Sequence, residues 1–253
     1  MLIPVIALAI AMQKDSDTWN LNTTVDPKVK LSWDVTVDAQ TEGQDHHAAF
    51  KLSRQLKSGD SKKSIVTFSW DHLEVDGQEG QEVTPWDAVV GSKGEIQKMD
   101  GDLDDSYRRM LSPLIFVTPE KPVAIGDKWT YDVKPTGAGA KITYGYEVKK
   151  TELLDGAQTI VLSSKFTEEG TEASTGEGTW WLSRVGRVVK FEIKLKNWIV
   201  PMAGSTTFSR MAAQSRYRPP GTPSTSRSVG TSPRQRGSRR PASRHPRSYI
   251  VTA

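Results

Sequence analysis

The 253-residue sequence contains no cysteine. This absence excludes disulfide bonds, thiolate metal sites and an N-terminal cysteine that could carry a lipid. It is compatible with an exported protein that folds without disulfides, but it does not by itself indicate export. Long apolar runs are missing as well. The clearest one covers about eleven residues at the N-terminus and is too short to span a bilayer.

Sequence motifs that carry chemistry are equally scarce. The chain has no G-x-S-x-G elbow, no Walker loop and no dinucleotide-binding glycine pattern. Segment 42–50 is interpreted as a polar loop, and His46 and His47 would point to opposite faces of a strand, so no metal site is predicted. His72, in phase with Trp70, is interpreted as a half-buried strand residue. We therefore expect a non-enzymatic protein without a metal or a cofactor.

The net charge of +4 combines two regions of opposite charge. Residues 210–253 contain ten arginines, no lysine and no acidic residue. Residues 1–209 keep 24 basic against 30 acidic residues, which is a net charge of −6. The arginine-rich tail is also rich in serine, proline and glycine, a composition that does not form a packed core, so residues 210–253 are predicted to be disordered.

The tail has two interpretations. As a functional arm it would bind nucleic acid or another anionic surface through arginine–phosphate pairing. As a frameshift product or an artificial junction near residues 208–214, it would contribute nothing to the fold. The second interpretation rests on the switch from lysine to arginine and on the end of the strand pattern there. Nucleic acid is thus an expected partner only if the tail is genuine.

The N-terminus resembles an export signal. Residues 1–11 form the apolar run, which ends in the small residues Ala9 and Ala11 at the spacing read by signal peptidase. No lysine or arginine precedes the run, which departs from the usual pattern, and a buried β-strand is the alternative. The first interpretation predicts a periplasmic or secreted protein without a transmembrane span.

Alternation of apolar and polar residues recurs along the chain and is typical of half-buried strands. The clearest runs are Val29–Val37, Ile142–Val148 and Val189–Leu195. Asp76-Gly77 and Asp155-Gly156 are typical of tight hairpins. The sequence therefore predicts a mainly β fold of antiparallel strands.

One segment has helical spacing. Leu103, Tyr107 and Met110 fall on one face of a helix over about 103–111, and Asp102 is a candidate N-cap. This helix lies between two stretches of strands. The predicted body is therefore one strongly curved antiparallel sheet, half-barrel or sandwich-like, with one short central helix.

The two stretches of strands resemble each other. We predict one duplicated β domain over 25–209, with halves at about 28–100 and 120–209. The alternative is that amphipathic strands in general look alike. Three matches occur in the same order: residues 30–35 with 128–133, 64–66 with 159–161, and 89–99 with 181–191.

Two segments carry a resemblance to known proteins. Residues 112–131, "SPLIFVTPEKPVAIGDKWTY", resemble a P-V-x-x-G-D-x-W segment of exported bacterial β-rich proteins, and "GEGTWWLSRVGRVVKFEIKL", residues 176–195, resembles a hairpin of the same group. The overall layout is loosely similar to the half-barrels of periplasmic lipoprotein carriers, which shelter acyl chains on a concave face. That similarity of architecture transfers no residue role.

Aromatic residues are the remaining indication of function. Trp180 and Trp181 would place one indole on each face of a strand. Aromatics that are not needed in the core would line a concave groove for an apolar or lipidic ligand, although a fully self-packed core is the alternative. A non-catalytic cell-envelope protein that binds lipid is the resulting hypothesis, and the sequence indicates no oligomeric state. The candidate ligand-binding residues are Trp33, Trp70, Tyr144, Tyr146, Trp181 and Phe191.

Overall fold

The computed structural model describes residues 18–22, 29–59, 63–80, 83–101, 103, 105–134, 139–171, 173–200, 206–208 and 210–219. These residues belong to one compact unit, 1–221, while the second unit, 222–253, lies outside them. The elements are β1 (Leu31–Thr41), β2 (Gln44–Gly59), β3 (Lys63–Val75), β4 (Gln78–Glu79), β5 (Trp86–Gly91), β6 (Ile96–Met99), α1 (Asp105–Leu111), the 3₁₀ turn η1 (Ser112–Leu114), β7 (Lys128–Val133), β8 (Ile142–Leu154), β9 (Ala157–Glu168), β10 (Thr175–Ser183), β11 (Val188–Lys196), β12 (Trp198–Val200), β13 (Thr206–Phe208) and β14 (Arg210–Arg218).

Alternating burial explains why these segments form a sheet. In β1, Leu31, Trp33, Val35 and Val37 are buried, whereas the polar residues between them are partly or fully exposed. Because successive side chains of a strand point to opposite faces, β1 has an apolar inner face and a polar outer face. The alternation predicted for this segment is confirmed.

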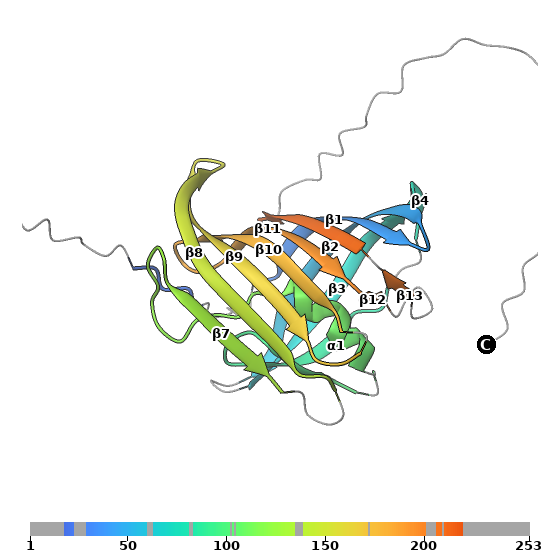
Figure 1. Cartoon of the computed structure of the whole chain (residues 1–253), viewed down its shortest axis with the longest axis horizontal. Helices are drawn as coiled ribbons and strands as arrows, with labels where there is room; N and C mark the ends of the chain where they lie inside the picture. The colour runs from blue at the N-terminus through green and yellow to red at the C-terminus, as the bar shows by residue number, and fades with distance from the viewer. Residues whose placement is uncertain are drawn as a thin grey trace, which may run out of the picture. The chain divides into compact units, whose positions relative to one another are not determined.

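The strands form one 12-stranded antiparallel sheet in the order β6-β5-β3-β2-β1-β14-β11-β10-β9-β8-β7, with β4 paired to β3. Strands β12 and β13 pair separately. Figure 1 shows the sheet curving around α1, which lies inside the curve. The predicted fold class, a mainly β protein with a curved antiparallel sheet and one short helix, is confirmed.

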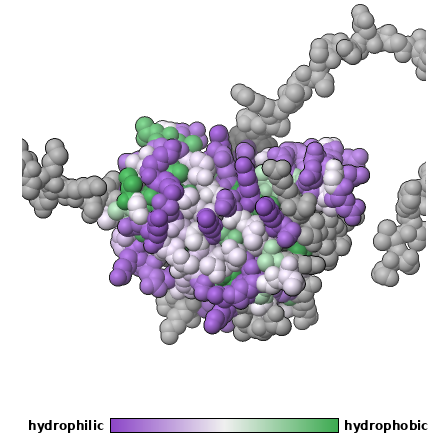
Figure 2. All heavy atoms as spheres, in the orientation of Figure 1, coloured by the Kyte–Doolittle hydropathy of each residue, from purple (hydrophilic) through white to green (hydrophobic). Residues whose placement is uncertain are grey.

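The outer face of the sheet is mostly polar. Figure 2 shows hydrophilic and intermediate side chains over most of the face that carries β8, β9 and β10, with the most evident hydrophobic patch at its upper left and smaller ones lower down. Among the described residues, the large hydrophobic side chains that remain exposed are Val75, Ile125, Leu153 and Val185. Most of the apolar material therefore lies on the inner face.

The strands of the two halves follow one another across the sheet in the same direction. Strands β1, β2, β3, β5 and β6 run from the middle to one edge, and β7 to β11 run from the other edge back to the middle. The segments matched in the sequence fall on equivalent strands: β1 with β7, β3 with β9, and the β5–β6 hairpin with the β10–β11 hairpin. Both hairpins turn at a glycine with positive φ, Gly94 and Gly186. Internal duplication itself stays a prediction.

The C-terminal boundary predicted at residues 209/210 is wrong. Strand β14 lies in the middle of the sheet and pairs antiparallel with β1 on one side and β11 on the other. Met211 and Ala213 are buried on the inner face. Arginine content had obscured this alternation. Residues 210–218 are thus part of the fold, and the disorder predicted further along the tail lies outside the described residues.

The helix is found at Asp105–Leu111, within the predicted segment. Its candidate N-cap Asp102 and the predicted signal peptide, residues 1–11, lie outside the described residues. In the described part of the chain, no helix is long and apolar enough to cross a membrane. At the N-terminal end, Trp19 is buried and its backbone forms a bridge with Val123.

Candidate functional site

The concave face of the sheet is lined by aromatic and aliphatic side chains. Tyr144 and Tyr146 on β8, Phe166 on β9, Trp180 on β10 and Phe191 on β11 are all buried there. Their rings contact one another, with Trp180 and Phe191 centroids 5.1 Å apart and Tyr144 and Phe166 centroids 5.5 Å apart. The second half of the sheet therefore presents a continuous apolar layer.

One short stretch of chain, Asp105–Thr118, covers this layer, and we call it the covering segment. It comprises α1, η1 and four residues beyond them. Phe116 packs against Tyr146, Trp180 and Trp129, with ring centroids 5.0, 5.8 and 6.2 Å apart. The other buried apolar side chains of the segment include Met110, Leu111, Leu114, Ile115 and Val117.

Aromatic side chains of the sheet hold the backbone of the covering segment. The Tyr144 hydroxyl donates to the Ser112 carbonyl at 3.2 Å, and the Val117 amide donates to the Tyr146 hydroxyl at 3.1 Å. The indole N–H groups of Trp129 and Trp198 donate to the carbonyls of Val117 and Met110. These bonds satisfy backbone groups that would otherwise be buried without partners.

Burial raises the pKa of both the Tyr144 and the Tyr146 hydroxyl well above the usual value of 10.0. Both side chains therefore stay neutral at physiological pH. The neutral Tyr144 hydroxyl can then donate a hydrogen bond to the Ser112 carbonyl, and the neutral Tyr146 hydroxyl can accept one from the Val117 amide. These two hydroxyl contacts between the sheet and the covering segment therefore persist at neutral pH.

Two arginines of α1 form ion pairs. Arg109 donates from Nε and Nη2 to the two carboxylate oxygens of Glu168 on β9, at 2.5 and 2.6 Å. The Glu168 side chain is only 1% exposed. The backbone N–H of Ser174 donates to the same carboxylate. Arg108, which is fully buried, pairs with Asp105. Buried ion pairs fix geometry, because removing one partner leaves an uncompensated charge in the interior.

The six predicted ligand-binding residues are only partly brought together. Trp33, Trp70, Tyr144, Tyr146 and Phe191 are buried on the inner face, where they contact the protein's own side chains. Their role in ligand binding stays a prediction.

The sixth residue, Trp181, lies on the outer face. It is the cross-strand neighbour of Lys190, whose ammonium group is 4.4 Å from the indole centroid, and its N–H donates to Glu152. Its neighbour Trp180 is the one that is buried inside. Alternation predicted one indole on each face, but which indole was internal depended on the strand register.

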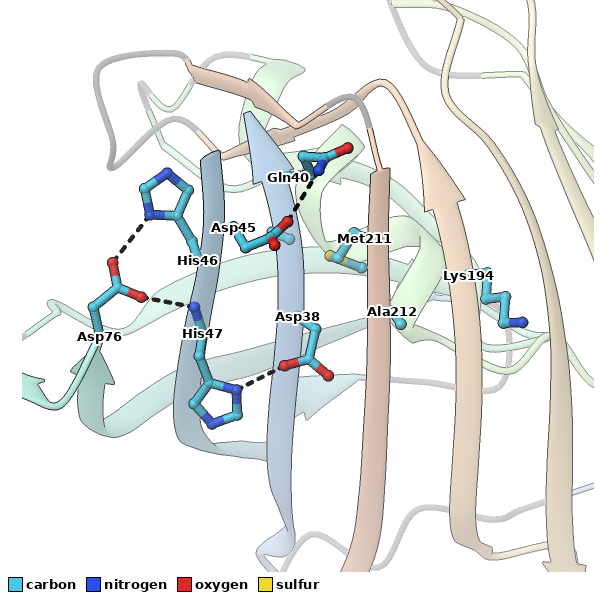
Figure 3. Close-up of a pocket in the computed structure, with 10 residues that line it drawn as sticks. Asp38, Gln40, Asp45, His46, His47, Asp76, Lys194, Met211 and Ala212 are labelled. Carbon is cyan, nitrogen blue, oxygen red and sulfur yellow. Dashed lines mark hydrogen bonds and ion pairs between the residues drawn. The ribbon is translucent and has the colours of Figure 1, made fainter. Parts of the chain in front are cut away.

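A depression of about 510 Å³ opens over β1, β2, β14 and β11 (Figure 3). His46 lies 3.0 Å from Asp76 and His47 lies 2.7 Å from Asp38 through their Nδ1 atoms. The hydrogen bond from His46 lowers the pKa of Asp76 below its usual 3.8.

These contacts correct two predictions. Residues 44–50 belong to strand β2 and are not a loop, and the side chains of His46 and His47 accordingly bond to different carboxylates, while the His47 backbone N–H donates to Asp76. His72 is exposed, with φ of 55°, at an irregularity in the β2–β3 pairing and is not half-buried. Among the described residues, no group of three histidine, aspartate or glutamate side chains could hold a metal ion.

Sequence reasoning also passed over Arg54. Its register partners Leu31 and Phe68 are buried on the inner face, so Arg54 points to the concave side of the sheet. Its guanidinium carbon lies 5.7 Å from the Trp33 ring centroid. A single arginine in an otherwise ordinary strand gave no signal in the sequence.

Comparisons with known proteins place the chain in no family. No protein-family model matches the sequence, and no curated protein matches it. The hypothetical lipoprotein YmcC from Escherichia coli (K12) is 13% identical, with 79% of this chain and 93% of that chain covered and a TM-score of 0.35. A protein from Bacteroides fragilis NCTC 9343 described as having a YmcC-like fold is 12% identical, with 75% and 94% covered and a TM-score of 0.32. A DUF1329 family protein from Desulfovibrio piger is 11% identical, with 77% and 87% covered and a TM-score of 0.24. At these values we draw no conclusion on fold or function from the similarities.

Proposed function

We propose that the protein is a non-catalytic, exported component of the cell envelope that binds an apolar or lipidic ligand on the concave face of its sheet. One observation carries the proposal. Among the described residues, the apolar concave layer is covered mainly by one short segment, Asp105–Thr118, which the small β12–β13 ribbon contacts through Trp198, and not by a second large sheet. A cover of this kind can be displaced without unpairing any strand of the sheet.

Magnitudes support an exchange between the covering segment and an acyl chain. The six large apolar side chains of the segment contribute on the order of 10 kcal/mol of burial, at roughly 2 kcal/mol each. An acyl chain of about sixteen carbons recovers a similar amount, at roughly 0.8 kcal/mol per buried CH₂. Because the two terms nearly cancel, the hydrogen bonds that hold the segment, at about 1 kcal/mol each, decide how readily it is displaced.

Lipid extraction is the first test. The protein is purified from cells without detergent and denatured in organic solvent, and the extract is analysed by mass spectrometry. Near-stoichiometric lipid is the expected result. Purified protein that carries no lipid and does not bind the fluorescent fatty acid parinaric acid would contradict the proposal.

A double variant tests directly whether the covering segment is displaced by the ligand. Tyr144→Phe combined with Tyr146→Phe removes two hydroxyl contacts to the segment and preserves ring packing. We expect parinaric acid to bind this variant several-fold more tightly than the wild type, because the segment is held less firmly. Tyr217→Phe is the control, since the Tyr217 hydroxyl accepts from Arg187 and not from the segment. Unchanged affinity in the double variant would argue against displacement of the segment.

The alternative, binding of nucleic acid through the arginine-rich tail, requires a more careful deletion than removal of residues 210–253. Arg218 already pairs with Asp34 across the sheet, and residues 210–218 form a central strand. Deleting 222–253 keeps that strand. Salt-sensitive DNA retention that this deletion abolishes would support the alternative.

A further inference from the structure

Arg54 differs from the arginines of α1 in having no carboxylate partner. Among the described residues, Arg108 pairs with Asp105 and Arg109 pairs with Glu168, whereas no ion pair or hydrogen bond engages Arg54. Its Nε is buried without a partner, although the residue as a whole keeps some exposure. Its positive charge therefore faces the concave side uncompensated.

The surroundings of Arg54 are apolar. Leu31 and Phe68 flank it across the neighbouring strands, and the Trp33 ring lies beside its guanidinium. This burial lowers the pKa of Arg54 from 12.5 to about 10. The group is still charged at neutral pH, so the concave side holds a partly buried cation that gains from any anion able to reach it.

Arg54 is also connected to the covering segment. Its cross-strand neighbour Phe68 pairs with Trp86 on β5, and Trp86 contacts Tyr107 of α1 with ring centroids 5.7 Å apart. A ligand that displaces the covering segment would extend along this row of inward-facing side chains. Arg54 lies in that row, between Phe68 and Leu31.

We infer that Arg54 binds the anionic head group of the ligand, so that the ligand is an anionic amphiphile with a carboxylate or phosphate at one end. The inference rests on the proposed function. The planar guanidinium can donate two parallel hydrogen bonds to a carboxylate or phosphate, and the Trp33 ring beside it favours a fixed orientation. The acyl chain of the same ligand lies on the aromatic layer.

Calorimetric titration with three probes tests the inference: oleate, oleyl alcohol and inorganic phosphate. Each is titrated into wild-type protein and into R54M, R54K and R187M. The control R187M removes another arginine that stacks on an aromatic ring, that of Tyr217, but one that already bonds a hydroxyl group. We expect R54M to weaken oleate binding at least tenfold and to leave oleyl alcohol within twofold of wild type. R54K keeps the positive charge but lacks the planar guanidinium that donates two parallel hydrogen bonds, so its loss of oleate affinity should be intermediate.

Stability provides a readout that a purely structural arginine would not give. Because R54M removes a partly buried charge whose Nε has no partner, its urea midpoint should equal or exceed that of the wild type. A lower midpoint would mean that Arg54 stabilises the fold through a contact of its own and would overturn the inference. If R54M does not fold, R54K with unchanged oleate affinity would overturn it equally.

The remaining outcomes separate the two proposals. Equal losses for oleate and oleyl alcohol in R54M, or no loss for oleate, overturn the role of Arg54 and leave the proposed function standing. If inorganic phosphate binds the wild type as tightly as oleate does, and R54M no longer binds phosphate, the ligand is a free anion. That result would overturn the inference that the ligand is an amphiphile. Failure of oleate and oleyl alcohol alike to bind wild type overturns the proposed function and this inference together.

Discussion

The two halves of the sheet differ in how many of their buried polar side-chain atoms have hydrogen-bond partners. In the second half, Tyr144, Tyr146 and Trp129 bond the covering segment, and Trp180 bonds Ser164. In the first half, the Trp70 indole nitrogen and the Arg54 Nε are buried without a partner. Among the described residues, no such unpaired buried atom lies on β7 to β11. The covering segment contacts both halves, through Tyr107 on Trp86 in the first and Phe116 on Tyr146 in the second, but these two unpaired buried atoms of the sheet lie in the first half.

Removing the strand that joins the halves should have the largest effect. A chain ending at residue 209 lacks β14 and exposes two unpaired strand edges, on β1 and β11. We expect it to lose cooperative unfolding and to aggregate, which circular dichroism during urea titration and light scattering would show. A chain ending at residue 221 should unfold like the full-length protein; if it does not, residues 222–253 contribute to the fold.

Glu168→Gln breaks the best-satisfied buried charge of the second half. Arg109 would lose its carboxylate partner, which costs about 3 kcal/mol for a buried pair. The urea-unfolding free energy measures this loss. Glu147→Gln is the control, since its pairs with Lys128 and Lys149 are exposed to solvent and contribute little to stability. Equal losses in the two variants would contradict the role of burial.

The equivalent glycines of the two hairpins allow a direct comparison of the halves. Gly186 has φ of 71°, and a Cβ there would lie 2.5 Å from the Leu21 carbonyl oxygen. Gly94 has φ of 88°, but its Cβ would lie 3.1 Å from the nearest atom. Both alanine variants incur the left-handed strain of about 1–2 kcal/mol, and Gly186→Ala adds the clash. Thermal unfolding should rank Gly186→Ala as the less stable; the reverse order would mean that residues 18–22 move aside at little cost.

The smallest expected effect is a pH dependence in the first half. Hydrogen bonds from Lys57 and Thr67 lower the pKa of Asp87 below its usual 3.8. The folded protein therefore takes up this proton less readily than the unfolded chain, and the stabilisation is complete above pH 3.8 and lost as the pH falls through the folded-state pKa. Asp87→Asn should accordingly lose less stability than the wild type between pH 7 and pH 3. Identical acid sensitivity would show that other carboxylates dominate.

Local patterns in the sequence were sufficient for much of the fold. Alternation in β1 and β8 and the helical spacing around Met110 each depend on neighbouring residues, which the sequence displays directly. Strand β14 was missed because the composition of the whole tail outweighed the inward-facing Met211 and Ala213. The face of Trp181 and the unpaired state of Arg54 depend on register and on distant partners, so no local pattern could predict them.

Strand β14 is among the last described residues of the chain, yet it lies in the middle of the sheet. During synthesis, both halves emerge before the strand that unites them, so the hydrogen bonds of β1 and β11 on that side cannot form until residues 210–218 have left the ribosome. The sheet of the nascent chain thus remains incomplete until β14 is available. A polypeptide that threads through a narrow translocation channel benefits from such a delay, because premature folding would block its passage.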